Sequence, residues 1–193
     1  MKLYKKDIEI INDNLYPLDL NYLKIIYKKM NIDYNIYIEK EDNSIKKING
    51  INHKEFIIND IMYYLQNNKI PKKTIYNKKI QNYENTNNIE DDYIYYGQYN
   101  TTNKKILKLL KSLTNNEFKF GGISQKLIKS IWKKNKLITY KNFAKLWLKE
   151  YKKGTGLYKE LAYNQCIKNK ENLDDWIKIK NNAINIIKKY GIL

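Results

Sequence analysis

Residues 118–134 read FKFGGISQKLIKSIWKK, and this stretch predicts an amphipathic helix that begins after a glycine break. Gly121-Gly122 interrupts the chain, after which apolar residues recur with helical spacing at Leu127, Ile128 and Ile131. Lysines recur on roughly one other face, at Lys126, Lys129, Lys133 and Lys136. The stretch therefore raises the questions of what packs on the apolar face and whether the lysines bind an anionic partner.

Helical patterns on both sides of this stretch predict a mainly α fold. Thr102 can cap a helix with the apolar stripe Ile106, Leu107, Leu110 and Leu113. Thr139 can cap another, with the stripe Tyr140, Phe143, Ala144, Trp147, Leu148 and Tyr151. A last helix is expected from Asn172, with acids in its first turn, lysines in its last turn and Gly191 beyond it. Its expected apolar face is Leu173, Trp176, Ile177, Ala183, Ile184 and Ile187.

The N-terminal part predicts two helices joined by a short β-hairpin. Asp19 is placed to cap a helix with the stripe Leu20, Leu23, Ile26, Tyr27 and Met30. A second stripe runs through Ile57, Ile61, Tyr64 and Leu65, and Pro71 follows its end. Between them, apolar residues alternate with polar ones before the turn residues Asp42-Asn43-Ser44, at Tyr34, Ile36 and Ile38.

Charge divides the chain into three expected segments. Residues 1–71 carry 11 Lys and 10 Asp+Glu, residues 72–102 carry four of each, and residues 103–193 carry 22 Lys and 6 Asp+Glu. The lack of Arg and Val, with many Ile, Asn, Lys and Tyr residues, indicates an AT-rich genome. Codon bias acts on the whole gene, however, and does not explain the asymmetry. We expect an N-terminal module over 1–71, a polar linker over 72–102 with tyrosines able to dock, and a basic helical domain over 103–193.

The two N-terminal helical segments also carry a family pattern. LDLNYLKIIYKKMNI (18–32) and GINHKEFIINDIMYYL (50–65) resemble the two helices of a SAP domain, a small helix–extended–helix module usually associated with DNA. The matching residues of the second helix are Gly50, Lys54, Ile57, Ile61 and Leu65. The chain departs from the family in the inserted hairpin and in Asp60, which stands where a basic residue is usual. The resemblance implies nucleic-acid association of this module.

The C-terminal half carries a second family pattern. LLKSLTNNEFKFGGISQKLIK (109–129) and TYKNFAKLW (139–147) are similar to a small helical domain of unknown function in bacterial proteins, where it follows a SAP-type domain. The matching features are Phe118, Phe120, Gln125 and the spacing from Thr139-Tyr140 to Trp147. YNQCIK (163–168) and NLDDWIKIK (172–180) resemble a second copy, with Lys180 in place of an expected Trp, which indicates an internal pseudo-repeat. This resemblance implies no established activity.

Few side chains suited to catalysis or metal binding are present. His53 is the only histidine and Cys166 the only cysteine, so a His/Cys zinc cluster is excluded and a Ser-His-Asp triad has little basis. We interpret His53 as a surface or capping residue, and the acidic run at 90–92 as a solvated part of the linker. No enzyme activity, cofactor or metal is expected. The rival interpretation is a weak, metal-dependent nuclease that uses Asp91 and Asp92.

The sequence also bears on location. No stretch approaches the roughly 18 consecutive apolar residues that a membrane span needs, and residues 1–7 do not resemble a signal peptide. The single Cys166 cannot form an internal disulfide, which suits a reducing compartment. We therefore expect a cytoplasmic protein with no membrane partner.

Lysine-lined helices provide the main prediction of function. Lys141, Lys145, Lys149 and Lys152 repeat the pattern of the preceding helix, and such cations can neutralise successive phosphates. We expect non-enzymatic binding of nucleic acid, DNA rather than RNA, with little sequence preference. The predicted nucleic-acid-binding residues are Lys54, Lys126, Lys129, Lys133, Lys134, Lys136, Lys141, Lys145 and Lys149.

Other features limit how nucleic acid would be bound. Trp132, Trp147 and Trp176 lie on or beside apolar stripes, so we interpret them as core residues rather than base-stacking platforms. The absence of arginine argues against bidentate recognition of guanine. Two alternatives remain open, namely lysines that only solvate the helices and a protein–protein interaction factor, such as a phage or mobile-element inhibitor or adaptor.

Overall fold

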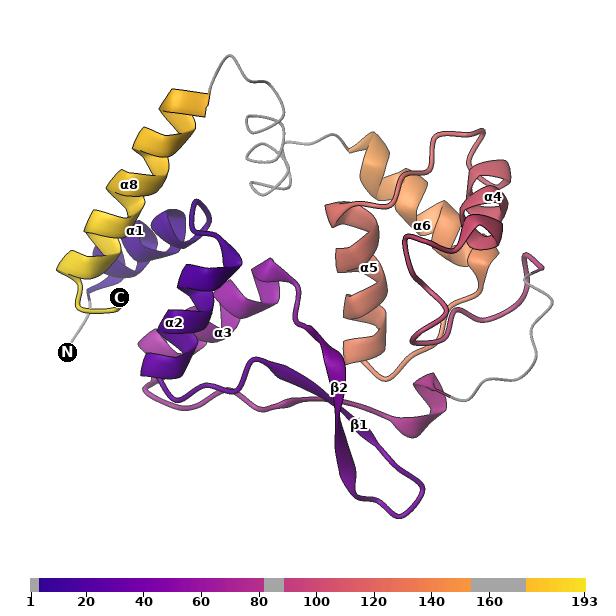
Figure 1. Cartoon of the computed structure of the whole chain (residues 1–193), viewed down its shortest axis with the longest axis horizontal. Coiled ribbons are helices and arrows are strands. Elements are labelled where there is room, and N and C mark those ends of the chain that lie inside the picture. The colour runs from indigo at the N-terminus through magenta and orange to yellow at the C-terminus, as the bar shows by residue number, and fades with distance from the viewer. Residues whose placement is uncertain (1–3, 82–88, 154–172) are drawn as a thin grey trace. The chain divides into compact units, whose positions relative to one another are not determined.

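The computed structural model describes residues 4–81, 89–153 and 173–193, and this part of the chain is mainly helical (Figure 1), as expected. The chain divides into two compact units. Unit 1 comprises Met1–Asn35, Gly50–Lys73 and Tyr158–Leu193, and unit 2 comprises Ile36–Asn49 and Thr74–Leu157. None of the helices that the structure describes is both long and apolar enough to cross a membrane.

Unit 1 is built from helices around a shared apolar core. Its described helices are α1 (Lys5–Leu15), α2 (Leu20–Lys29), α3 (Lys54–Asn67) and α8 (Leu173–Lys189). Their apolar stripes meet in a core that includes Ile11, Leu15, Leu23, Ile26, Tyr27, Ile57, Ile61, Ala183, Ile184 and Ile187. α1 was not among the expected helices, although Ile8, Ile11 and Leu15 have the spacing of a helical stripe.

Local signals set the ends of these helices. Asp19 caps α2 as expected, because its carboxylate accepts hydrogen bonds from the N–H groups of Asn21 and Tyr22 at 3.0 and 3.2 Å. α2 ends at Lys29, and Asn31 just beyond its C-cap adopts a left-handed conformation with φ of 55°. Asn and Gly adopt this conformation most readily, and Asn68 and Gly191 follow α3 and α8 in the same way.

The last helix packs in unit 1, whereas the charge pattern had grouped it with the basic segment 103–193. α8 lies against α1, and the Tyr190 hydroxyl donates a hydrogen bond to Asp7 at 3.0 Å. Its acids and lysines occupy the first and last turns as expected. The apolar face is narrower than predicted, since Ala183, Ile184 and Ile187 are buried while Ile177 is 46% exposed.

Unit 2 contains a small sheet that the sequence revealed only in part. β1 (Asn35–Glu39) and β2 (Ile45–Ile51) form the expected hairpin, and the Asp42 carboxylate in its turn accepts a hydrogen bond from the Ser44 N–H at 2.9 Å. β3 (Thr74–Tyr76) pairs in parallel with β1, which gives the strand order β2-β1-β3. Ile36 and Ile38 of β1 are buried, and residues 36–49 of the hairpin are grouped with unit 2 rather than with the N-terminal helices.

The expected linker over 72–102 is part of unit 2 along most of its described length. β3 is followed by the 3-10 helix η1 (Lys78–Ile80), and Tyr95 and Tyr99 are buried. Ile94 N–H donates to the carbonyl of Ile138 at 2.9 Å, and Trp132 Nε1 donates to the carbonyl of Ile94 at 3.2 Å. These partners are distant in sequence, so local polarity alone could not indicate that the segment docks.

Three helices complete the described part of unit 2, α4 (Lys104–Ser112), α5 (Gly122–Lys133) and α6 (Tyr140–Lys152). α6 contacts both α4 and α5 (Figure 1). Thr139 caps α6 as expected, but Asn103 rather than Thr102 caps α4, because the Asn103 side chain accepts a hydrogen bond from Ile106 N–H. Residues 163–168 of the second copy of the expected pseudo-repeat lie outside the described residues, and its other segment, 172–180, falls almost entirely within α8.

Candidate nucleic-acid interface

α5 separates an apolar face from a lysine face. Ile123, Ser124, Ile128 and Trp132 are buried, while Lys126, Lys129 and Lys133 lie on the opposite side of the helix. Lys133 is exposed, and Lys126 and Lys129 are half-buried. The expected fourth member of this row, Lys136, is exposed but lies beyond the end of the helix. The left-handed Asn135, with φ of 54°, turns the chain before it.

α6 repeats this separation over its full length. Tyr140, Phe143, Ala144 and Trp147 are buried, and Lys141, Lys145, Lys149 and Lys152 lie on the other side. Consecutive lysines of the first three are about 6 Å apart along the axis, because each residue rises about 1.5 Å. Lys145, Lys149 and Lys152 are exposed, so their ammonium groups lie at the surface of the helix.

α4 adds lysines that were not among the predicted binding residues. Lys104 and Lys108 are exposed and Lys111 is half-buried, opposite the buried Ile106 and Leu110. The signal was present in the sequence as a spacing of four and three residues, the same spacing that identified the other two rows. Across residues 104–153 the chain carries 15 Lys against only two acids, Glu117 and Glu150. The described surface of these helices is therefore strongly cationic.

Ion pairs reduce the number of lysines available to a ligand. Lys141 Nζ lies 2.8 Å from a carboxylate oxygen of Glu90, and this hydrogen bond and charge raise the pKa of Lys141. Lys153 is paired with Glu150 at 2.6 Å. Glu90 belongs to the acidic run at 90–92, which was expected to be solvated. Its side chain and its carbonyl both accept hydrogen bonds from Lys141, so this residue is attached to the start of α6.

Lys54 occupies a different environment from the other predicted residues. It is the first residue of α3 in unit 1, and its Nζ donates a hydrogen bond to the carbonyl of Tyr16 at 2.6 Å. That contact joins the start of α3 to the chain between α1 and α2. The structure therefore gives Lys54 a structural contact within unit 1, whereas the other eight predicted lysines belong to α5, α6 and the loop between them.

The tryptophans of unit 2 are core residues, as predicted. Trp132 is 3% exposed and Trp147 is 2% exposed. Trp132 contacts the rings of Tyr76, Tyr96 and Tyr99, with centroids 5.3 to 6.4 Å apart. Neither indole is exposed enough to stack on a base, whereas the exposed lysines of these helices are suited to contacts with the phosphate backbone.

Side chains suited to metal binding are not brought together in the described residues. In these ranges, no group of three or more His, Cys, Asp or Glu residues is arranged to hold a metal ion. His53 is buried and caps α3, since its Nδ1 accepts a hydrogen bond from the N–H of Glu55 at 3.4 Å. This agrees with its interpretation as a capping residue.

The lysine rows of α4, α5 and α6 thus form the candidate interface, set on one side of helices whose other side is apolar and buried. Comparison with known proteins adds no family to this description. No protein-family model, curated protein or solved structure matches the chain.

Proposed function

We propose that this chain binds nucleic acid, with duplex DNA preferred over RNA, through the lysine rows of unit 2. The single observation that carries the proposal is the charge of residues 104–153, where 15 lysines stand against two acids and lie largely on the solvent side of three helices. Such a surface attracts polyanions and releases their condensed counterions on binding.

The proposed contacts are to phosphates rather than to bases. The chain contains no arginine, whose planar guanidinium group recognises guanine through two hydrogen bonds. Lysine carries a compact point charge and does not provide this planar arrangement. The indoles of unit 2 are buried, which removes two candidates for base stacking. The expected result is affinity with little dependence on base sequence and no catalytic step.

We further propose that α2 and α3 form a SAP-like pair of helices. We also propose that residues 109–147 and 163–180 are two copies of a pseudo-repeat, and that the protein is cytoplasmic. In support, α2 lies within 18–32, α3 overlaps 50–65 over most of its length, and the two helices contact each other. The hairpin between them is grouped with unit 2, so the SAP-like pair would consist of the helices alone.

The test is a fluorescence-anisotropy titration of the full chain with two labelled duplexes of unrelated sequence and with an RNA duplex. We expect saturable binding at low salt, affinities for the two DNA sequences within about threefold of each other, and weaker binding of RNA. The proposal would be contradicted if the chain bound none of these three nucleic acids. A stoichiometric complex with a cellular protein that survives nuclease treatment, in a chain that binds no nucleic acid, would favour the interaction factor instead.

A further inference from the structure

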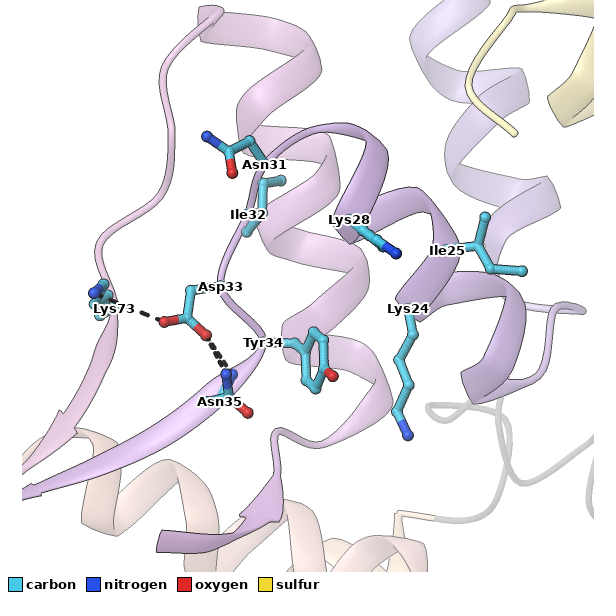
Figure 2. Close-up of a pocket in the computed structure, with 9 residues that line it drawn as sticks. All are labelled: Lys24, Ile25, Lys28, Asn31, Ile32, Asp33, Tyr34, Asn35 and Lys73. Atoms are coloured by element: carbon cyan, nitrogen blue, oxygen red, sulfur yellow. Dashed lines mark hydrogen bonds and ion pairs between the residues drawn. The ribbon is translucent and has the colours of Figure 1, made fainter. Parts of the chain in front are cut away.

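A pocket of about 720 Å³ opens in unit 1 beside α2 and the chain that leads from it into β1 (Figure 2). Its polar lining comprises Lys24, Lys28, Lys73, Asp33, Asn31 and Asn35, and its apolar lining comprises Ile25, Ile32 and Tyr34. The volume falls within the range of about 300–1,000 Å³ that is usual for small-molecule sites. All of its lining residues belong to unit 1, so the pocket is contained in one unit.

The backbone places two of the lysines together on one wall. Lys24 and Lys28 are four residues apart on α2, so they lie on the same face of the helix. At the end of α2, the left-handed Asn31 reverses the chain, and Ile32 N–H donates to the carbonyl of Tyr27 at 2.8 Å. The residues that follow this turn, from Ile32 to Asn35, line the pocket together with the two lysines.

The acid of the pocket is held away from these two lysines. The Asp33 carboxylate accepts hydrogen bonds from the N–H and Nδ2 of Asn35 at 2.9 and 2.7 Å and lies 3.8 Å from Lys73 Nζ (Figure 2). Lys73 and Asp33 therefore balance each other in charge. Neither Lys24 nor Lys28 forms an ion pair with another described residue, which leaves a local excess of two positive charges.

An aromatic ring lies next to these charges. Lys24 Nζ is 5.8 Å from the ring centroid of Tyr34, and the Tyr34 ring meets Tyr27 edge-on at 6.4 Å. Tyr27 is itself fixed, because it is fully buried and its hydroxyl donates to Asp60 at 2.9 Å. The buried Tyr27 ring therefore supports the position of the Tyr34 ring. Ile25, on the other side of the two lysines, is 52% exposed and adds apolar surface to the pocket (Figure 2).

We propose that this pocket binds a nucleotide, with the phosphate on Lys24 and Lys28 and the base against Tyr34. Two cations and a supported aromatic ring match a ligand that joins an anionic group to a flat ring system. The proposal does not rest on DNA binding by unit 2, because none of its residues belongs to the lysine rows of α4, α5 and α6. The nucleotide can be free or part of a single strand.

The experiment is an amide chemical-shift titration of the full chain with thymidine monophosphate, adenosine monophosphate, thymidine and a short single-stranded oligonucleotide. We expect saturable shifts at the amides of residues 24–35 and 73, and affinity at least about tenfold weaker for thymidine, which lacks the phosphate. Shifts from both monophosphates assign the site to a free nucleotide. The same shifts from the oligonucleotide alone assign it to a nucleotide within a strand.

A matched pair of variants tests the residues. Lys24→Gln with Lys28→Gln should weaken binding by about tenfold or more, whereas Lys5→Gln with Lys69→Gln, two exposed lysines of unit 1 outside the pocket, should leave it within about twofold. Both variants should keep the thermal midpoint of the wild type, since the four side chains lie at the surface or in the open pocket. The proposal is overturned if no ligand shifts these amides, or if the two variants lose equal affinity.

Discussion

The Asp19 carboxylate accepts a hydrogen bond from Lys180 Nζ at 2.6 Å, although 161 residues separate them in sequence. The same carboxylate caps α2 through the N–H groups of Asn21 and Tyr22. Lys180 Nζ also lies 5.3 Å from the ring centroid of Tyr22. The Asp19 side chain therefore both caps the N-terminal helix α2 and forms an ion pair with Lys180 of the C-terminal helix α8.

Substitution of Asp19 separates these two roles. Asp19→Asn keeps a good capping side chain but loses the ion pair, which is partly exposed and contributes less than about 1 kcal/mol. Asp19→Ala loses both, so the free energy of unfolding should fall by about 1–2 kcal/mol. Urea denaturation followed by circular dichroism should show that the free energy of unfolding decreases from the wild type to Asp19→Asn and further to Asp19→Ala. Equal stability of the Ala variant and the wild type would contradict the role of the cap.

The pH dependence of this contact has a defined sign. Burial tends to raise the pKa of Asp19, but hydrogen bonds from Lys180, Tyr22 and Asn21 and the charge of Lys180 together lower it below the ordinary value of 3.8. A lowered acid pKa means that the stabilisation is present above the unfolded-state pKa and is lost as the pH falls through the folded-state pKa. Carboxyl titration by NMR should show a higher Asp19 pKa in Lys180→Gln than in the wild type. An unchanged pKa would show that Lys180 contributes nothing.

Trp132 provides a test of packing against base stacking. Trp132→Phe keeps a buried ring but loses the hydrogen bond to the Ile94 carbonyl, which should lower the free energy of unfolding by about 1 kcal/mol or more. DNA affinity should stay within about twofold of the wild type, because the indole is buried. Urea denaturation measures the stability, and fluorescence anisotropy on the same preparation measures the DNA affinity. Lost affinity with unchanged stability would mean that Trp132 contacts the ligand.

Charge location can be separated from net charge with two quadruple variants. The first replaces exposed lysines of unit 2 by glutamine, at Lys134, Lys136, Lys145 and Lys149. The control replaces exposed lysines of unit 1, at Lys5, Lys6, Lys69 and Lys72. Both variants lose the same net charge, but only the first should reduce the slope of log affinity against log salt, by up to about 3.6 if all four lysines contact phosphates. Equal slopes in the two variants would place the contact elsewhere than in unit 2.

Features set by neighbouring residues could be predicted from the sequence. The caps Asp19 and Thr139, the turn at Asp42-Asn43-Ser44 and the end of α8 before Gly191 each depend on a few consecutive residues. The lysine rows of α5 and α6 could be predicted from spacing alone, because the solvent side of a helix repeats with the same period as its buried side.

Features set by distant residues could not be predicted in this way. The parallel pairing of β3 with β1, the docking of Ile94 on Ile138 and the packing of α8 on α1 need partners far along the chain. The pairing of Lys141 with Glu90 has the same cause, and it reduced the predicted site by one available cation. Charge composition grouped α8 with residues 103–193, whereas its buried Ala183, Ile184 and Ile187 belong to the apolar core of unit 1.

The salt dependence of duplex DNA binding by the full wild-type chain tests the central claim most directly. Anisotropy titrations between about 50 and 200 mM salt should show log affinity falling linearly with log salt, with a slope that corresponds to several phosphate contacts. Two unrelated duplex sequences should give the same slope. Absence of binding at the lowest salt, or an affinity that does not change with salt, would contradict binding through the lysine rows of α4, α5 and α6.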